Sequence, residues 1–353
     1  MRAPSPLPAA GSGTVFLTEG GSETELMYRH GFELPEFAMF PLLDIPDAVT
    51  AMRDMFRAQL DVAAEFDLGF LLSGLDYRSS PDWGAKLGYS ATALADANVA
   101  AIAFLKEIAS DYRDQIPSLL IGGILGPRGD AYGLNREMTA EGAEQYHAVQ
   151  LETLKRAQVD FACAMTFNNI PEAVGAARAA ARIGIPLSVS LTLDRTHRLR
   201  SGPTLGEAIA GIDALTGLDA PDYYLVNCSH PLEYEPALDD GAWIRRLRGV
   251  RPNASRMEKM ALCKLNHLEA GNPVELAMQL GDLHARHPHM DVFGGCCGTG
   301  DTHLRAFARA LKQIPSSNGL VLGEVRGSRS VANSGGHGFA SRRPGVDDAD
   351  PTI

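Results

Sequence analysis

The sequence predicts an α/β fold, a closed (β/α)8 TIM barrel, on the basis of three observations. Short apolar runs typical of buried strands recur along the chain, segments with helical spacing lie between many of them, and this alternation fills residues 14–314 of 353. Alternating strands and helices indicate a parallel sheet. In such a barrel all strands end at one rim, where active sites lie. Side chains that directly follow the strands are therefore the candidates for function.

The expected strands are apolar runs that end in glycine, proline or polar residues. They cover residues 14–18, 68–73, 118–125, 160–167, 186–193, 223–228, 247–252 and 290–295. The expected helices show apolar residues at three- and four-residue spacing or begin at a capping residue. They are a short helix after Glu25, a helix from about Asp47, one capped by Ser90, residues 139–157, 171–182 and 204–215, and one capped by Asp301.

The two ends of the chain have no such periodicity. Residues 1–13 are expected to form a flexible leader, and residues 315–353 a flexible or docking tail. The net charge of -11 and the lack of a clustered basic face argue against nucleic acid and anionic membranes as partners. No stretch is long enough to span a membrane and no secretory signal is evident, so a cytoplasmic protein is expected. A homo-oligomer is possible.

Adjacent cysteines, Cys296 and Cys297, end the last expected strand among several glycines. A disulfide between neighbours would close a strained ring, whereas both thiolates can bind one metal ion if the backbone turns sharply, as glycine permits. Cys228 ends the strand at 223–228 in the same way. Because both sites belong to one rim of the barrel, the three sulfurs are expected to converge on a single zinc ion.

Three thiolates leave tetrahedral zinc one ligand short, and an open position is the mark of a catalytic site. A closed structural site would need a fourth protein ligand, and His230 and His303 are the local candidates. The remaining cysteines, Cys163 and Cys263, lie among apolar neighbours and are expected to be buried thiols outside the site.

Two other patterns compete with this interpretation. His284, His287 and His289 have metal-ligand spacing, but they precede the last strand and so belong to the amino end of the barrel, the face associated with stability. The glycine-rich residues 294–300 could bind phosphate at a helix start. With two cysteines inside this run and no lysine after it, a nucleotide loop is disfavoured.

Zinc bound by three thiolates carries a net charge of about -1, so it is a poor generator of hydroxide. It is better suited to holding a substrate thiol as a thiolate, which can attack an alkyl group directly. Methyl donors for this attack are sulfonium or ammonium cations. Tyr77, Trp83 and Glu19, in loops that follow strands, are expected to receive the cation.

These residues resemble the zinc-dependent homocysteine S-methyltransferases, which include the betaine and S-methylmethionine users. The resemblance covers roughly residues 14–313. It rests on Gly294–Thr299, Val226–Cys228 and Glu19–Gly21, supported by Gly126-Pro127 and Pro252-Asn253. It implies that the three cysteines bind zinc, that the homocysteine sulfur takes the fourth position, and that the product is methionine. No cobalamin-binding segment is present.

The candidate substrate-binding residues are Glu19, Gly20, Gly21, Tyr77, Met165, Thr166, Asn227 and Asn253. Two of them depart from the family pattern. The family usually has aspartate at the position of Glu19, and at the position of Met165 a glutamate that contacts the amino group of homocysteine. A thioether cannot pair with an ammonium group. Either Glu19 supplies this contact, or the acceptor is a different thiol.

The sequence thus predicts a zinc-dependent enzyme that moves a methyl group from a small cationic donor to a thiol acceptor, with homocysteine as the first choice. No catalytic side chain is expected beyond the activated substrate thiol. Two alternatives stay open: a non-enzymatic thiol or metal sensor on a barrel scaffold, and a catabolic demethylase with a different thiol acceptor. S-methylmethionine, S-adenosylmethionine and betaine are all possible donors, since fold alone does not choose among them.

Overall fold

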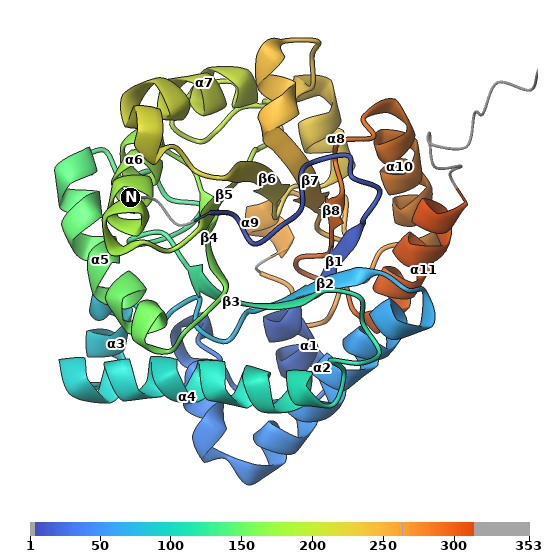
Figure 1. Cartoon of the computed structure of the whole chain (residues 1–353). Coiled ribbons are helices and arrows are strands. Elements are labelled where there is room, and N and C mark those ends of the chain that lie inside the picture. Colours follow the sequence, from blue (N-terminus) through green and yellow to red (C-terminus); the bar gives the residue numbers. More distant parts are fainter. Residues whose placement is uncertain (1–3, 263, 314–353) are drawn as a thin grey trace, which may run out of the picture. The chain divides into compact units, whose positions relative to one another are not determined.

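The computed structural model of the protein describes residues 4–262 and 264–313. Parallel strands pair in chain order and close into a barrel, as predicted, with helices around the outside (Figure 1). The strands are β1 Phe16–Thr18, β2 Gly69–Leu72, β3 Leu119–Leu125, β4 Phe161–Phe167, β5 Leu187–Leu191, β6 Tyr223–Asn227, β7 Leu247–Arg251 and β8 Val292–Phe293. Pairing of Phe16 with Val292 closes the ring between β1 and β8. The predicted tail and Cys263 lie outside the described residues.

The helices follow the predicted order with additions. They are α1 Ser22–Tyr28, α2 Pro46–Glu65, α3 Pro81–Lys86, α4 Ala91–Ser110, α5 Ala140–Arg156, α6 Ile170–Ile183, α7 Leu205–Thr216, α8 Pro231–Tyr234, α9 Lys259–Leu262, α10 Pro273–Arg286 and α11 Asp301–Lys312. Ser90 caps α4 as predicted, by accepting a hydrogen bond from the backbone N–H of Ala93. Asp301 is not the cap of α11, because Gly300 holds that position and Asp301 is the first helical residue.

The alternation of strands and helices is less regular than predicted. The connection from β6 to β7 contains the short α8 and 3-10 turns instead of a long helix. By contrast, α10 covers the approach to β8 although the sequence analysis assigned no helix there. Its N-terminal signals are ordinary ones: Asn272 caps it and Pro273 begins it.

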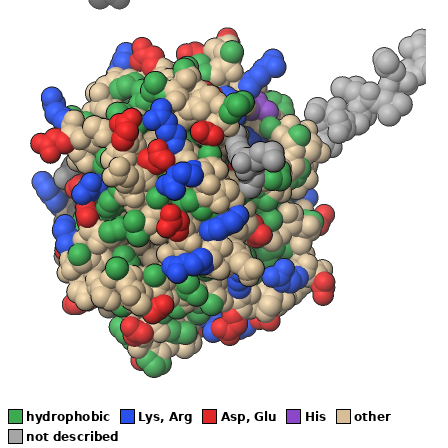
Figure 2. Space-filling view, turned by 60° about the vertical axis from the view of Figure 1, so that its left-hand side comes forward, with side chains coloured by type: hydrophobic (Ala, Val, Ile, Leu, Met, Phe, Trp, Pro, Cys, Tyr) green, Lys and Arg blue, Asp and Glu red, His purple; other side chains and the backbone are tan. Residues whose placement is uncertain are grey.

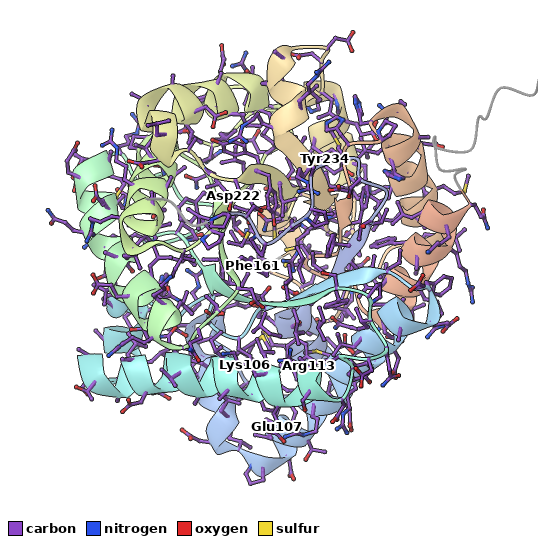
Figure 3. The ribbon with its side chains drawn as sticks, in the orientation of Figure 1. Lys106, Glu107, Arg113, Phe161, Asp222 and Tyr234 are labelled. Atoms are coloured by element: carbon purple, nitrogen blue, oxygen red, sulfur yellow. The ribbon has the colours of Figure 1, made fainter. Side chains whose placement is uncertain are left out.

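The barrel interior is filled by alternate residues of the strands. In β4, Phe161, Cys163 and Met165 belong to the inner cluster, whereas the residues between them pack against the helices. Phe161 is labelled in Figure 3. Cys163 is buried, as predicted. This period of two follows from the pleat of the strand, and it directs Met165, the last of the three, toward the carboxyl rim.

The amino end of the interior is covered by the segment expected to be a flexible leader. From Pro4 to Gly13 it has no helix or strand, yet Leu7 is buried in the inner cluster. Arg248 donates a hydrogen bond to the Pro8 carbonyl at 3.0 Å, and the Gly11 N–H donates to Asp291 at 3.3 Å. These contacts attach the segment to the face opposite the catalytic rim of such barrels.

On the face shown in Figure 2, basic and acidic side chains are interspersed rather than gathered by sign. None of the helices in the described part of the chain combines the length and apolar character needed to cross a membrane.

Asp76 is a buried carboxyl group that joins β2 to β3. Its Oδ2 accepts a hydrogen bond from the Ile124 N–H at 3.0 Å, and Gln150 donates to its backbone carbonyl at 2.8 Å. Burial raises the pKa of Asp76 to about 7. The folded state therefore favours the neutral acid.

We expect the Asp76→Asn variant to lose part of the pH dependence of stability. Because the pKa of Asp76 is higher folded than unfolded, its contribution is fully present below the unfolded pKa, near 4, and is lost as the pH rises through about 7. The slope is at most about 1.4 kcal/mol per pH unit. Asparagine keeps the acceptor oxygen and does not titrate. Urea unfolding of both proteins at pH 5 and pH 8 gives the change in the free energy of unfolding with pH. An equal change in the wild type and the variant would contradict the assignment.

Candidate metal and substrate site

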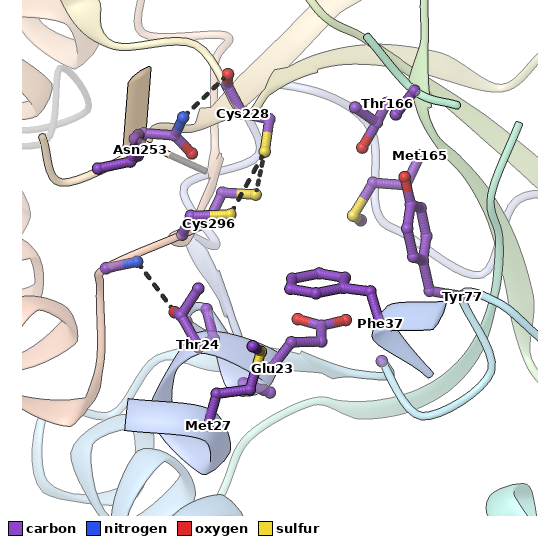
Figure 4. A pocket seen from close by; sticks show the side chains of 18 of the residues that line it. Glu23, Thr24, Met27, Phe37, Tyr77, Met165, Thr166, Cys228, Asn253 and Cys296 are labelled. Atoms are coloured by element: carbon purple, nitrogen blue, oxygen red, sulfur yellow. Dashed lines mark hydrogen bonds between the residues drawn. The ribbon is translucent and has the colours of Figure 1, made fainter. Parts of the chain in front are cut away.

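The predicted thiols come together at the carboxyl rim. The Sγ of Cys228 lies 2.9 Å from that of Cys296 and 3.8 Å from that of Cys297, and all three atoms lie within 4.8 Å of one another (Figure 4). They are free thiols. Sulfurs bound to one tetrahedral zinc at about 2.3 Å lie about 3.8 Å apart. A small increase in the distance between the Sγ atoms of Cys228 and Cys296 would therefore let the three sulfurs hold a metal ion.

Cys228 is held in a left-handed backbone conformation, with φ at 53°. For a residue with a side chain this conformation costs on the order of 1–3 kcal/mol and persists only where neighbours enforce it. The Cys228 N–H donates to the Arg251 carbonyl, and Asn253 donates to the Cys228 carbonyl, both at 3.1 Å. Strand β7 and the loop after it therefore fix the turn that directs Cys228 toward the other two cysteines.

The turn that carries Cys296 and Cys297 is fitted closely to the loop after β1. A Cβ on Gly21 would lie 2.4 Å from the Cys296 carbonyl oxygen, so this contact requires glycine. Gly298 has φ at 84°, which lets the chain reverse directly after the two cysteines. Thr24 accepts a hydrogen bond from the Gly298 N–H at 3.0 Å.

The three thiols perturb one another strongly. Hydrogen bonds from Cys296 and Cys297 lower the pKa of the Cys228 thiol well below its ordinary value. The same bonds raise the pKa of Cys296 and Cys297, the donors. Without a cation the cluster thus favours a single shared thiolate. A divalent cation would allow all three to ionise, with release of protons.

No histidine completes the set among the described residues. His303 contacts the Ala270 carbonyl at 2.8 Å, and His230 accepts a hydrogen bond from the Leu232 N–H at 3.2 Å. The side chain beside the cluster is Tyr132, whose hydroxyl lies 3.1 Å from the Cys228 Sγ. A closed site of three cysteines and one histidine is therefore not supported.

The histidines before β8 have other contacts. His284 contacts the Met290 carbonyl at 2.7 Å, and His289 the Ile244 carbonyl at 2.9 Å. Within the described part of the chain, the three cysteines are the group of possible metal ligands that lies together. These contacts with backbone carbonyls are consistent with a structural role for His284 and His289.

A cavity of about 390 Å³ lies in front of the cysteines. Loops after β1, β2, β3, β6, β7 and β8 contribute to its wall, and β4 contributes residues of the strand itself. Among the sequence-predicted residues it is lined by Glu19, Gly20, Gly21, Tyr77, Trp83, Met165, Thr166, Asn253 and the three cysteines. The cysteines and the candidate substrate residues other than Asn227 thus share one chamber.

Asn227 lies behind the cavity wall and is fully buried. Its Oδ1 accepts from the Thr166 N–H at 2.9 Å and from Ser190 at 2.7 Å, while its Nδ2 donates to the Thr166 hydroxyl at 2.8 Å. Thr166, like Cys228, has a positive φ, here 65°. Asn227 therefore positions Thr166 and is not itself part of the cavity surface.

A sequence model of the homocysteine S-methyltransferase family matches residues 16–311. The chain belongs to the homocysteine S-methyltransferase family. A search of curated proteins found no match. Among solved structures, the metallated form of the homocysteine methyltransferase MmuM from Escherichia coli is similar at 19% identity and a TM-score of 0.63, covering 84% of this chain and 96% of that one. The apo form of the same protein is similar at 18% identity and a TM-score of 0.58, covering 85% of this chain and 97% of that one. At this identity the likeness shows the shared fold.

The carboxylate of Glu19 already interacts with other side chains of the protein. Its Oε1 lies 2.9 Å from Arg251 and accepts from Ser73 at 2.8 Å, and its side chain is 2% exposed. Its Oε2 is buried with no hydrogen-bond partner among the described residues. The charge of Glu19 is matched by Arg251, which weakens the expectation that Glu19 contacts a substrate ammonium group.

The aromatic residues expected to receive a cationic donor differ in availability. The Trp83 ring already lies 4.1 Å from both the Arg78 guanidinium and the Lys86 ammonium, so it is a poor receiver of a further cation. Tyr77 lies 5.0 Å from Arg78. Phe37 also lines the cavity, and no cation of the described residues lies over its ring. Trp83 is therefore withdrawn as a donor contact.

Sequence analysis missed several residues of the cavity wall: Glu23, Phe37, Tyr132, Arg251 and Lys259. All except Phe37 lie at or soon after strand ends. That position could have singled them out, but it does not show which side chains turn inward.

We expect one equivalent of Zn2+ to bind the wild type and the Cys296→Ala variant to bind it at least about 100-fold more weakly, because loss of one thiolate leaves two. Cys163→Ala is the matched control, since Cys163 is a buried thiol of the barrel interior outside the cluster. Competition titration with a chromogenic chelator gives both affinities. Equal affinity of the wild type and Cys296→Ala would exclude this cluster as the metal site.

Proposed function

We propose that the protein is a zinc-dependent thiol methyltransferase. It transfers a methyl group from a sulfonium or quaternary ammonium donor to the thiol of a small amino acid, with homocysteine as the first candidate and methionine as its product. The observation that supports this most directly is the convergence of Cys228, Cys296 and Cys297 on the wall of a cavity of about 390 Å³. The family match and the chemistry of a three-thiolate site agree with it.

Cys228, Cys296 and Cys297 would hold Zn2+, which when bound keeps an acceptor sulfur deprotonated near neutral pH. Tyr132 adds a hydroxyl at 3.1 Å from the Cys228 Sγ, and a hydrogen bond from it would withdraw charge from that sulfur. Arg251, buried beside the cysteine turn, donates to the Gly295 carbonyl at 3.2 Å. These residues hold the cluster in place and moderate its negative charge.

The proposed reaction is a direct displacement. The acceptor thiol gives up its proton, and a sulfur lone pair forms the new S–CH3 bond. The C–S or C–N bond of the donor breaks at the same time, and its electron pair stays on the donor heteroatom, which leaves neutral. Neither step requires a side-chain nucleophile. Phe37, Tyr77 and Met165 offer an apolar and aromatic wall of the kind that attracts methylated cations.

We expect the purified protein to transfer a labelled methyl group to homocysteine from at least one of S-methylmethionine, S-adenosylmethionine and betaine. Treatment with EDTA should abolish transfer, and added Zn2+ should restore it, because the acceptor sulfur is activated at the metal. Mass spectrometry across the donors and a panel of thiols, including cysteine and a selenium analogue, identifies both substrates.

Two outcomes would contradict the proposal. Binding of thiols without turnover of any donor would indicate a sensor. Full activity in the Cys296→Ala variant would show that the reaction does not depend on the cysteine cluster. Transfer to a thiol other than homocysteine would keep the mechanism and change the acceptor.

A further inference from the structure

Glu23 places a carboxyl group in the cavity that holds the cysteine cluster. It is the second residue of α1, and its side chain points into the chamber that Met165 and Tyr77 also line (Figure 4). The hydrogen bond from the Gly298 N–H to Thr24, the next residue, attaches this helix to the cysteine turn. The position of Glu23 relative to the thiols is therefore set by the fold.

The other carboxyl groups of the cavity are already engaged. Glu19 is paired with Arg251 at 2.9 Å, and Glu269 lies 3.0 Å from His267. Asp130 accepts from the Tyr132 N–H at 2.8 Å. Among the described residues, Glu23 has no ion pair or hydrogen bond with another residue. It is thus the cavity carboxyl group without a partner.

An unpaired carboxylate in this position is unfavourable. Desolvation raises the pKa of Glu23 to about 7, and the negative charge of the cysteine cluster acts in the same direction. A cation bound beside Glu23 would stabilise the carboxylate. The cavity therefore favours a positively charged ligand group beside the carboxyl group of Glu23.

We propose that Glu23 binds the ammonium group of an amino-acid thiol acceptor and so determines which thiols the site accepts. This inference rests on the proposed function. An ammonium group can donate charge-assisted hydrogen bonds to a carboxylate, whereas the methylated sulfonium or quaternary ammonium centre of a donor has no N–H or S–H to donate. The thioether of Met165, on the same cavity, cannot make this contact. Glu23 is therefore assigned to the ammonium group of the acceptor, and the aromatic wall to the methylated centre of the donor.

The test compares two acceptors that differ by one group: homocysteine and 4-sulfanylbutanoate, which lacks the ammonium group. Cobalt-substituted protein is titrated with each thiol, and the sulfur-to-cobalt absorption band reports binding without any methyl donor. We expect the wild type to bind homocysteine about 10- to 100-fold more tightly than 4-sulfanylbutanoate, as a charge-assisted hydrogen bond implies. Glu23→Gln should bind homocysteine as weakly as 4-sulfanylbutanoate, with the affinity for 4-sulfanylbutanoate unchanged.

Glu25→Gln is the matched control, because Glu25 lies on the same short helix and pairs with Arg29 at 3.5 Å. It should keep the wild-type preference. Glu23→Asp should keep part of it. Adding Met165→Glu to the Glu23→Gln variant should restore a preference for homocysteine, since it returns a carboxylate to the same cavity from strand β4.

Two results would overturn the inference: an unchanged preference in Glu23→Gln, or an equal weakening of both thiols. Each of these leaves thiol binding at the metal intact and so leaves the proposed function standing. If no thiol alters the cobalt spectrum of the wild type, the proposed function itself fails, and the inference with it.

Discussion

Three thiols held within 4.8 Å of one another are the constraint on which this site depends. Such a cluster cannot ionise fully without a cation, as the opposed pKa shifts of Cys228 and Cys296 show. The backbone also carries strain, because Cys228 and Thr166 have left-handed conformations that cost on the order of 1–3 kcal/mol each. Hydrogen bonds from β7 and from Asn227 enforce both conformations. The barrel thus stabilises, before any ligand arrives, an arrangement that a metal ion would complete.

The charges around the cluster are distributed in an ordered way. Arg251 balances Glu19 in the cavity wall, so this buried pair contributes little net charge to the substrate chamber. Met165 adds none. Glu23 is left as the carboxyl group that a cationic ligand group can approach. In a barrel, each βα loop can change without altering the strands. The cysteine cluster could therefore be kept while the residues that recognise the rest of the substrate come from a different βα loop.

Much of the fold followed from simple patterns. Apolar runs located all the strands, since strands of a parallel barrel are covered on both faces. Cysteines at the ends of β6 and β8, with glycines beside those of β8, indicated the candidate metal ligands. The helix α10 was missed although Asn272 and Pro273 are ordinary start signals. The contact of Leu7 with the barrel interior could not have been predicted, because one apolar residue among prolines and alanines has no periodicity.

The sequence by itself determined the barrel, the rim on which function lies and the thiols that belong together, because these depend on periodicity and on residue types with few alternative uses. Only the tertiary structure decided which charges are free. Glu19 and Glu23 lie in one short segment, and the sequence analysis singled out only the first. Arg251, distant in the chain, pairs with the first and not with the second, and this difference arises only when β7 and β1 approach each other on either side of β8.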